Sequence, residues 1–203
     1  MSTDLPNTDA AKRSRRGLIF LALLFFAPLL ASFVLYYGKL WRPEGGTNKG
    51  ELISPARPLP EVSLTLGDGT KGSTELLRGK WTWVYIGDGQ CDERCKTALA
   101  DTRQARLLLT EKINRVQRMF LATDRCCDFR YLSDEQPDLV VAKLDNAEFA
   151  AVFPLYDNVP LANAGRIYLV DPLGNLMMSY APDAPNTGLL EDIKKLLKLS
   201  HIG

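Results

Sequence analysis

Histidine is almost absent from this sequence, since its 203 residues include only one, His201, close to the C-terminus. This scarcity excludes most sites that need a histidine general base or several histidine metal ligands. The charged residues balance, with 25 Lys and Arg against 24 Asp and Glu, so no basic field indicates a nucleic acid partner. Cysteines number only four, too few for a disulfide scaffold, so their spacing is more informative than their number.

One long uncharged run is present, at residues 17–37. At about 1.5 Å per residue, a helix of this length crosses a hydrocarbon core of about 30 Å. The basic residues before it are Lys12, Arg13, Arg15 and Arg16. This excess on the N-terminal side predicts a single-pass anchor in a bacterial inner membrane. Residues 1–16 then form a cytoplasmic basic tail without fixed structure, and the remainder of the chain is periplasmic.

Two other interpretations of the apolar run are a cleaved signal peptide and a twin-arginine signal. The run is longer than the usual apolar part of a signal peptide, and bulky residues fill the expected cleavage zone. The sequence Ser14-Arg15-Arg16 before the run fits a twin-arginine signal. Paired arginines beside a membrane span are more often topology determinants, so an uncleaved anchor is the prediction that we favour.

The rest of the chain is predicted to form a tether over residues 38–60 and one folded domain over residues 61–203. The tether is rich in Gly and Pro and lacks periodicity. Apolar runs and turn signals predict strands at 62–66, 81–86, 117–122, 166–170 and 176–180, and helices at 91–116, 137–153 and 189–199. This order predicts an α/β domain with a thioredoxin-like mixed sheet flanked by helices, preceded by one transmembrane helix.

Cys91 and Cys95 lie where the strongest apolar strand, residues 81–86, gives way to a helix. Sites in open α/β sheets gather at the carboxyl ends of strands, and residues four apart share one helix face. The flanking Gly and charged residues predict an exposed loop edge with both sulfurs reachable by solvent. Such a pair is able to form a disulfide or to bind a soft metal ion such as Cu(I) or zinc. The alternative is a pair of structural cysteines on an amphipathic helix.

Two longer segments carry a resemblance to a known family. Residues 79–87 read GKWTWVYIG and are followed by Cys91 and Cys95, and residues 167–175 read IYLVDPLGN. With the anchor and the tether, these segments resemble the SCO (SenC) proteins. The resemblance implies a thioredoxin fold and a role in cytochrome c oxidase assembly. In that role the protein delivers copper to the binuclear copper site of subunit II or reduces its cysteines, with Cys91 and Cys95 as catalytic residues or Cu(I) ligands.

The sequence departs from the family where a copper ligand is expected. The family places proline beside each motif cysteine, whereas Asp92 and Lys96 stand here. It also places a histidine ligand shortly before the last central strand, whereas residues 160–165 read PLANAG. Cys126 or Cys127, after the second central strand, is a candidate third ligand or resolving thiol. The alternative for these two is one buried and one idle cysteine.

Three functions therefore stay open. The first is a copper-handling assembly factor for cytochrome c oxidase, with subunit II or other assembly factors as partners. The second is a general extracytoplasmic thiol–disulfide oxidoreductase. The third is a non-catalytic docking protein with a degenerate thioredoxin fold. We favour a role in oxidase biogenesis, through copper delivery or thiol reduction.

Overall fold

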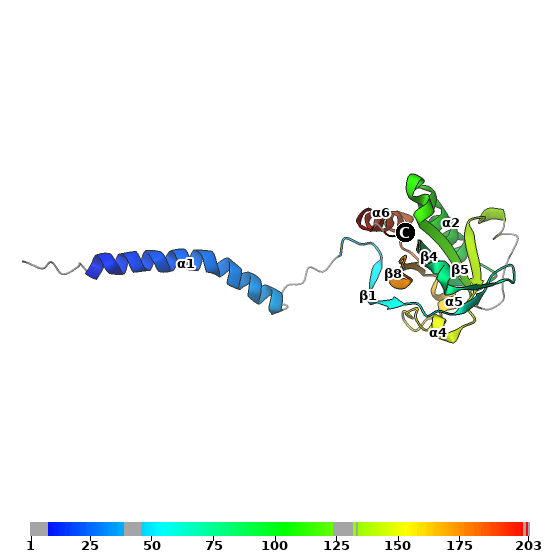
Figure 1. Cartoon of the computed structure of the whole chain (residues 1–203), viewed down its shortest axis with the longest axis horizontal. Helices are drawn as coiled ribbons and strands as arrows, with labels where there is room; N and C mark the ends of the chain where they lie inside the picture. The colour runs from blue at the N-terminus through cyan, green and yellow to red at the C-terminus, as the bar shows by residue number, and fades with distance from the viewer. Residues whose placement is uncertain (1–7, 39–45, 124–131, 133, 201, 203) are drawn as a thin grey trace, which may run out of the picture. The chain divides into compact units, whose positions relative to one another are not determined.

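The computed structural model describes residues 8–38, 46–123, 132, 134–200 and 202, and it divides the chain into two compact units. The first unit, residues 1–46, contains helix α1 (Thr8–Tyr37) (Figure 1). Its stretch Arg15–Tyr37 is apolar, exposed and long enough to cross a membrane. The predicted apolar helix is therefore confirmed as a candidate membrane span. Residues 8–16 were expected to be an unstructured tail, but they extend this helix by more than two turns.

The second unit, residues 47–203, is built on a six-stranded mixed sheet with the order β1-β8-β7-β4-β5-β6 (Figure 1). Strands β4, β5 and β6 are parallel to one another. Strand β7 runs antiparallel to β4, β8 runs antiparallel to β7, and β1 runs antiparallel to β8. The strands are β1 (Glu51–Pro58), β4 (Trp81–Gly87), β5 (Val116–Ala122), β6 (Leu139–Lys143), β7 (Ile167–Val170) and β8 (Asn175–Tyr180). The predicted thioredoxin-like mixed sheet is confirmed.

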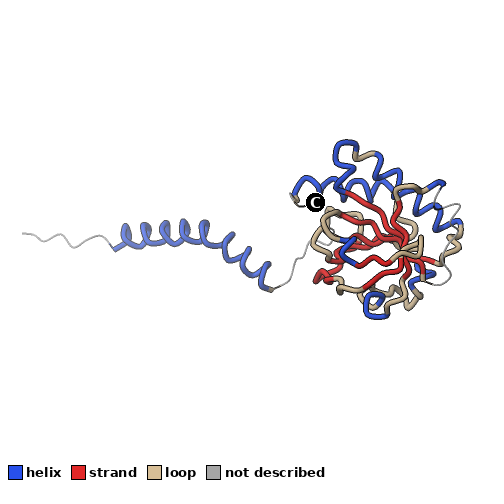
Figure 2. The backbone as a smooth tube through the Cα atoms, turned by 45° about the vertical axis from the view of Figure 1, so that its right-hand side comes forward, coloured by secondary structure: helices blue, strands red, loops and turns tan. Residues whose placement is uncertain are grey.

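Helices cover both faces of this sheet, as Figure 2 shows. Because side chains alternate along a strand, Trp83 of β4 enters the core beneath α2 and α6, while Val84 enters the opposite core. All seven residues of β4 are buried, as its continuous apolar sequence predicts for a strand covered on both faces. The helices are α2 (Glu93–Leu107), η2 (Thr110–Arg115), α4 (Ala147–Ala150), α5 (Leu161–Ala164) and α6 (Asn186–Leu199). A separate hairpin of β2 (Ser63–Thr65) and β3 (Lys71–Ser73) is followed by η1 (Thr74–Leu77).

Two predicted helices differ from the structure. The segment 137–153 was expected to form one or two short helices, but its first half forms strand β6, which pairs in parallel with β5. Its β-branched residues suit an edge strand, and only the later residues form the short helix α4. The helix expected over 91–116 ends as α2 at Leu107, and Thr110, the first residue of η2, turns the backbone with a φ of 47°.

The predicted tether contains a strand that the sequence did not reveal. β1 pairs antiparallel with β8 as an edge strand, and most of its residues are exposed, so it has no apolar alternation. The buried carboxylate of Asp192 in α6 accepts hydrogen bonds from the backbone N–H groups of Lys49 and Gly50, at 2.8 Å each. A Cβ at Gly50 would lie 2.6 Å from Met178 Sδ, so this close approach needs glycine. The compact unit therefore begins at Thr47, upstream of the domain start expected at residue 61.

Candidate functional site

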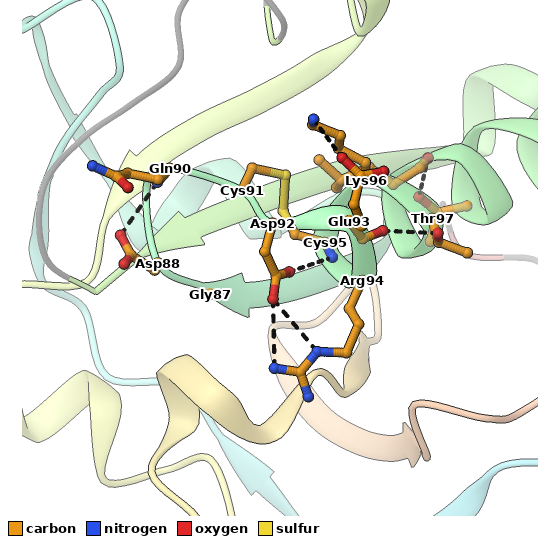
Figure 3. Close-up of a disulfide and its surroundings, with 12 residues drawn as sticks. Gly87, Asp88, Gln90, Cys91, Asp92, Glu93, Arg94, Cys95, Lys96 and Thr97 are labelled. Atoms are coloured by element: carbon orange, nitrogen blue, oxygen red, sulfur yellow. Dashed lines mark hydrogen bonds and ion pairs between the residues drawn. A yellow bond between two sulfur atoms is a disulfide. The ribbon is translucent and has the colours of Figure 1, made fainter.

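Cys91 and Cys95 form a disulfide bond at the carboxyl end of β4, with their Cα atoms 5.0 Å apart (Figure 3). Cys91 ends the loop that follows β4, and Cys95 lies in the first turn of α2. The structure thus brings together the two cysteines that the four-residue spacing places on one helix face. Their assignment as catalytic residues or metal ligands remains a prediction.

Two hydrogen bonds fix the backbone around the disulfide. The N–H of Cys91 donates to the carbonyl oxygen of Asp88 at 3.0 Å, and Cys91 itself has a φ of 49°. Asp92 is the N-cap of α2, and its Oδ1 accepts from the N–H of Cys95 at 3.0 Å (Figure 3). A cap of this kind fixes where the helix begins. Cys91 therefore lies one residue before the cap, in a left-handed conformation that is uncommon for a side-chain-bearing residue.

The four charged residues around the disulfide form two ion pairs. Arg94 Nε lies 3.4 Å from Asp92 Oδ2, and Lys96 Nζ lies 2.8 Å from Glu93 Oε1 (Figure 3). All four side chains are more than a third exposed, so water and salt screen their charges. The negative charges of Asp92 and Glu93 disfavour a thiolate. Each of them is paired with a positive charge, on Arg94 or Lys96, that favours a thiolate. The formal charges of these four side chains therefore cancel.

Both cysteines are buried, which corrects the expectation of solvent-reachable sulfurs at a loop edge. Each is 2% exposed and belongs to the core beneath α2. The exposed charges around them gave a misleading signal, because the first turn of α2 turns its cysteine inward and its charged residues outward. The two cysteines nevertheless line a cavity of about 400 Å³. Access to the disulfide is through this cavity.

The cavity wall also contains residues that sequence reasoning did not select. Tyr85 reaches it from β4, and Asn163 and Gly165 reach it from α5 and the turn that follows. Burial raises the pKa of Tyr85 to about 12, with a further rise from the charge of Asp92 that Arg94 opposes. Strand alternation could have predicted the position of Tyr85. It places Trp81, Trp83 and Tyr85 on the same face of β4, with Tyr85 at the end of the strand nearest the cysteines.

The structure does not describe the other candidate metal ligands. Cys126, Cys127 and His201 lie outside the described part of the chain. Among the residues that are described, no cluster of three or more His, Cys, Asp or Glu side chains is arranged to hold a metal ion. The stretch in which the resemblance implies a histidine does line the cavity, and it presents Ala162 and Asn163 there.

Solved structures of Sco proteins share this fold. Copper-bound ScoI of Bradyrhizobium japonicum is 22% identical, with 68% of this chain and 98% of that chain covered and a TM-score of 0.52. Apo Sco1 of Thermus thermophilus is 19% identical, with 75% and 99% covered and a TM-score of 0.60. BsSco, a Sco-family cytochrome c oxidase assembly protein with an identified disulfide switch, is 17% identical, with 74% and 99% covered and a TM-score of 0.55.

These similarities confirm the resemblance to Sco proteins at the level of the fold. No curated protein sequence matches the chain. A protein-family model described as the transmembrane-like, thioredoxin-like, C-terminal domain matches residues 81–200, which contain the disulfide, strands β4 to β8 and helix α6. The match spans more than half of the sequence, and the chain belongs to this family of thioredoxin-like domains.

Proposed function

We propose that this chain is a membrane-anchored, Sco-like protein that assists cytochrome c oxidase biogenesis by reducing a disulfide in a partner. The observation that carries the proposal is the Cys91–Cys95 bond at the junction of β4 and α2. The Sco-like fold supports the choice of pathway, since BsSco is a cytochrome c oxidase assembly protein with a disulfide switch. We infer that α1 crosses the inner membrane once, with its N-terminus cytoplasmic and the domain periplasmic.

The proposed reaction is a pair of thiol–disulfide exchanges. In the reduced chain, the Cys91 thiolate attacks one sulfur of a partner disulfide, and the partner's second sulfur leaves as a thiolate. Cys95 then attacks Cys91 as a thiolate, which forms the Cys91–Cys95 bond and releases the partner's first sulfur. Two electrons pass to the partner, and the disulfide seen here is the product state. A dithiol reductant on the same side of the membrane returns the chain to its reduced form.

The surroundings of the disulfide offer room for a partner segment. A second hollow of about 240 Å³ shares Arg94 and Gly165 with the disulfide cavity, so the two adjoin. Its walls include apolar residues of α6 and of the segment before it, such as Leu189 and Pro182. We infer that a partner cysteine enters the disulfide cavity while neighbouring residues of the partner lie along this second hollow.

Replacing Cys95 by serine should trap the partner. In Cys95→Ser cells, the mixed disulfide through Cys91 has no resolving thiol, so it should accumulate and be visible on non-reducing gels. Mass spectrometry of the trapped species should identify a periplasmic protein with paired cysteines, and subunit II of the oxidase is the expected one. The matched control is Cys91→Ser combined with Cys95→Ser, which should trap nothing. Equal trapping by the two variants, or none by the first, would contradict the reaction.

Copper delivery is a second candidate function, favoured by the closeness of the two sulfurs at the start of α2. In the disulfide form neither sulfur is a thiolate, so the pair must be reduced before it can take a soft metal ion as cargo. Cys126 or Cys127 stays a candidate third ligand.

The copper proposal predicts a simple binding result. The reduced full-length chain in detergent should retain about one Cu(I) against a mild chelating competitor, because soft thiolates select this ion. The Cys91→Ser variant and the oxidised wild-type chain should both lose it. Loss of copper from the reduced wild-type chain would reject delivery as the function and leave disulfide reduction unaffected.

A further inference from the structure

The ring of Tyr85 is held in one position beside the disulfide cavity. Tyr85 is 4% exposed and stacks on Phe120, with ring centroids 6.0 Å apart. A Cβ at Gly87 would lie 2.9 Å from Tyr85 Cε1, closer than real contacts allow, so glycine leaves the space that the ring occupies. The ring is therefore fixed from two sides.

The Tyr85 hydroxyl differs in its hydrogen bonding from the hydroxyls of Tyr156, Tyr168 and Tyr180, the other tyrosines that the structure describes in this domain. Tyr156 pairs with Ser179 Oγ at 2.6 Å, Tyr168 donates to the Pro154 carbonyl at 3.2 Å, and Tyr180 donates to Asp192 Oδ2 at 3.4 Å. Across the described ranges, the Tyr85 hydroxyl has no protein partner. The Tyr85 hydroxyl is not among the fully buried side-chain atoms that lack a partner, and Tyr85 lines the cavity with both sulfurs, so its O–H is open to this cavity. Its acceptor is therefore expected inside this cavity.

We propose that the Tyr85 O–H donates a hydrogen bond to the thiolate that forms when the Cys91–Cys95 bond opens, which makes Tyr85 a catalytic residue. This inference rests on the proposed disulfide exchange. When a reducing thiolate attacks one sulfur of the bond, the S–S bond breaks and its electron pair stays on the other sulfur. That sulfur becomes a thiolate inside a mostly buried cavity, where an O–H donor stabilises the charge strongly.

Tyr85 stays a donor throughout the reaction. Its pKa is raised to about 12, first by burial and then by Asp92, whereas a cysteine thiol ionises near pH 8.5 in its unperturbed state. At neutral pH the phenol therefore keeps its proton and shares it with the thiolate in a hydrogen bond. The charged groups that line the same cavity are Asp88, Asp92, Arg94 and Lys96. Arg94 pairs with Asp92 and Lys96 with Glu93, so none of these bases is a dedicated partner of the thiolate.

The test is the Tyr85→Phe variant of the full-length chain in detergent, which keeps the ring and removes the O–H. The redox state of Cys91 and Cys95 is read by peptide-resolved alkylation and mass spectrometry after equilibration with glutathione. One charge-assisted hydrogen bond should change the equilibrium constant for reduction about tenfold, which lowers the potential by about 30 mV for a two-electron couple. Reduction by dithiothreitol should slow by a similar factor.

Two further variants of the chain distinguish a chemical role of Tyr85 from a structural one. Tyr168→Phe removes a real hydrogen bond to Pro154 in the opposite core and should leave the potential unchanged. A fluorinated tyrosine at position 85 is a stronger O–H donor of nearly the same size, so it should raise the potential above that of wild type. The fluorinated chain still tests the role of Tyr85 if the Tyr85→Phe variant does not fold normally.

The possible results distinguish this inference from the function on which it rests. A tenfold change in Tyr85→Phe with an unchanged Tyr168→Phe supports the role of Tyr85. If the wild-type disulfide exchanges readily and the Tyr85→Phe variant has the same reduction potential and the same rate of reduction, the role of Tyr85 is overturned and the proposed function is not. A wild-type disulfide that resists dithiothreitol in the folded chain overturns the proposed function as well.

Discussion

Cells in which Cys91→Ser and Cys95→Ser are combined should lose cytochrome c oxidase activity to the level of cells that lack the chain. In the proposed reaction the exchange chemistry resides in these two sulfurs, and serine fills nearly the same space without a redox function. The disulfide closes a short loop, so its removal should lower the stability of the domain only modestly. Oxygen consumption, the haem spectrum of the oxidase and the amount of chain in membranes together measure the outcome.

The same experiment decides between a redox protein and a docking protein. Normal oxidase activity in the double serine cells would indicate that the fold acts by contact alone. Ala100→Ser, on an exposed part of the same helix and outside both cavities, is a matched control that should leave activity unchanged. In the double serine cells, rescue by an added membrane-permeant dithiol would support thiol reduction. Rescue by added copper would instead support copper delivery.

The central part of the fold was predictable because its strands are covered on both faces. A strand of this kind must be apolar at nearly every position, and residues 81–86 and 166–170 show such runs directly in the sequence. The edge strands have no such signature. β6 is only half-buried, and β1 is almost wholly exposed and held by backbone pairing with β8 and by Asp192. Neither feature leaves an apolar pattern in the sequence.

The candidate site was predictable only in its local part. The short separation of Cys91 and Cys95 was enough to predict that the sulfurs lie close together, although Cys91 lies before the N-cap of α2 and its left-handed backbone was not predicted. Their burial and their cavity depend on segments that are distant in the sequence. Asn163 and Gly165 reach the cysteines because β7 lies beside β4 in the sheet, an order that local patterns do not encode.

Replacement of the buried Arg118 should destabilise the domain strongly. Arg118 is a charged residue in the middle of β5 and is 1% exposed. Its guanidinium contacts the Asp138 carboxylate, Gln136 Oε1 at 2.8 Å and the Leu99 carbonyl of α2 at 2.8 Å. It therefore ties the helix that begins beside Cys95 to the sheet. Methionine would remove the hydrogen bonds that Arg118 donates to Asp138, Gln136 and Leu99.

We expect Arg118→Met to lower the free energy of unfolding by about 3 kcal/mol, the lower end for breaking a buried ion pair. The lower end applies because the Asp138 side chain is 30% exposed and keeps its contact with Arg106 at 2.9 Å. Urea titration of the full-length chain in detergent, followed by tryptophan fluorescence, measures the change. Arg103→Met is the matched control, since Arg103 makes an exposed contact with the Glu135 carbonyl and should cost less than about 1 kcal/mol.

At low pH, the difference in stability between the wild-type chain and the Arg118→Met variant should become smaller. Burial alone would raise the pKa of Asp138, but the hydrogen bond and charge of Arg118 outweigh it, so the pKa is lowered from its usual 3.8. A lowered folded-state pKa stabilises the fold fully above the unfolded value and loses that stabilisation as pH falls through the folded value. The two urea midpoints should therefore stay apart at neutral pH and converge below about pH 4. A constant separation down to the acid transition would show that Arg118 stabilises the domain by packing and its neutral hydrogen bonds, without a contribution from the charge of Asp138.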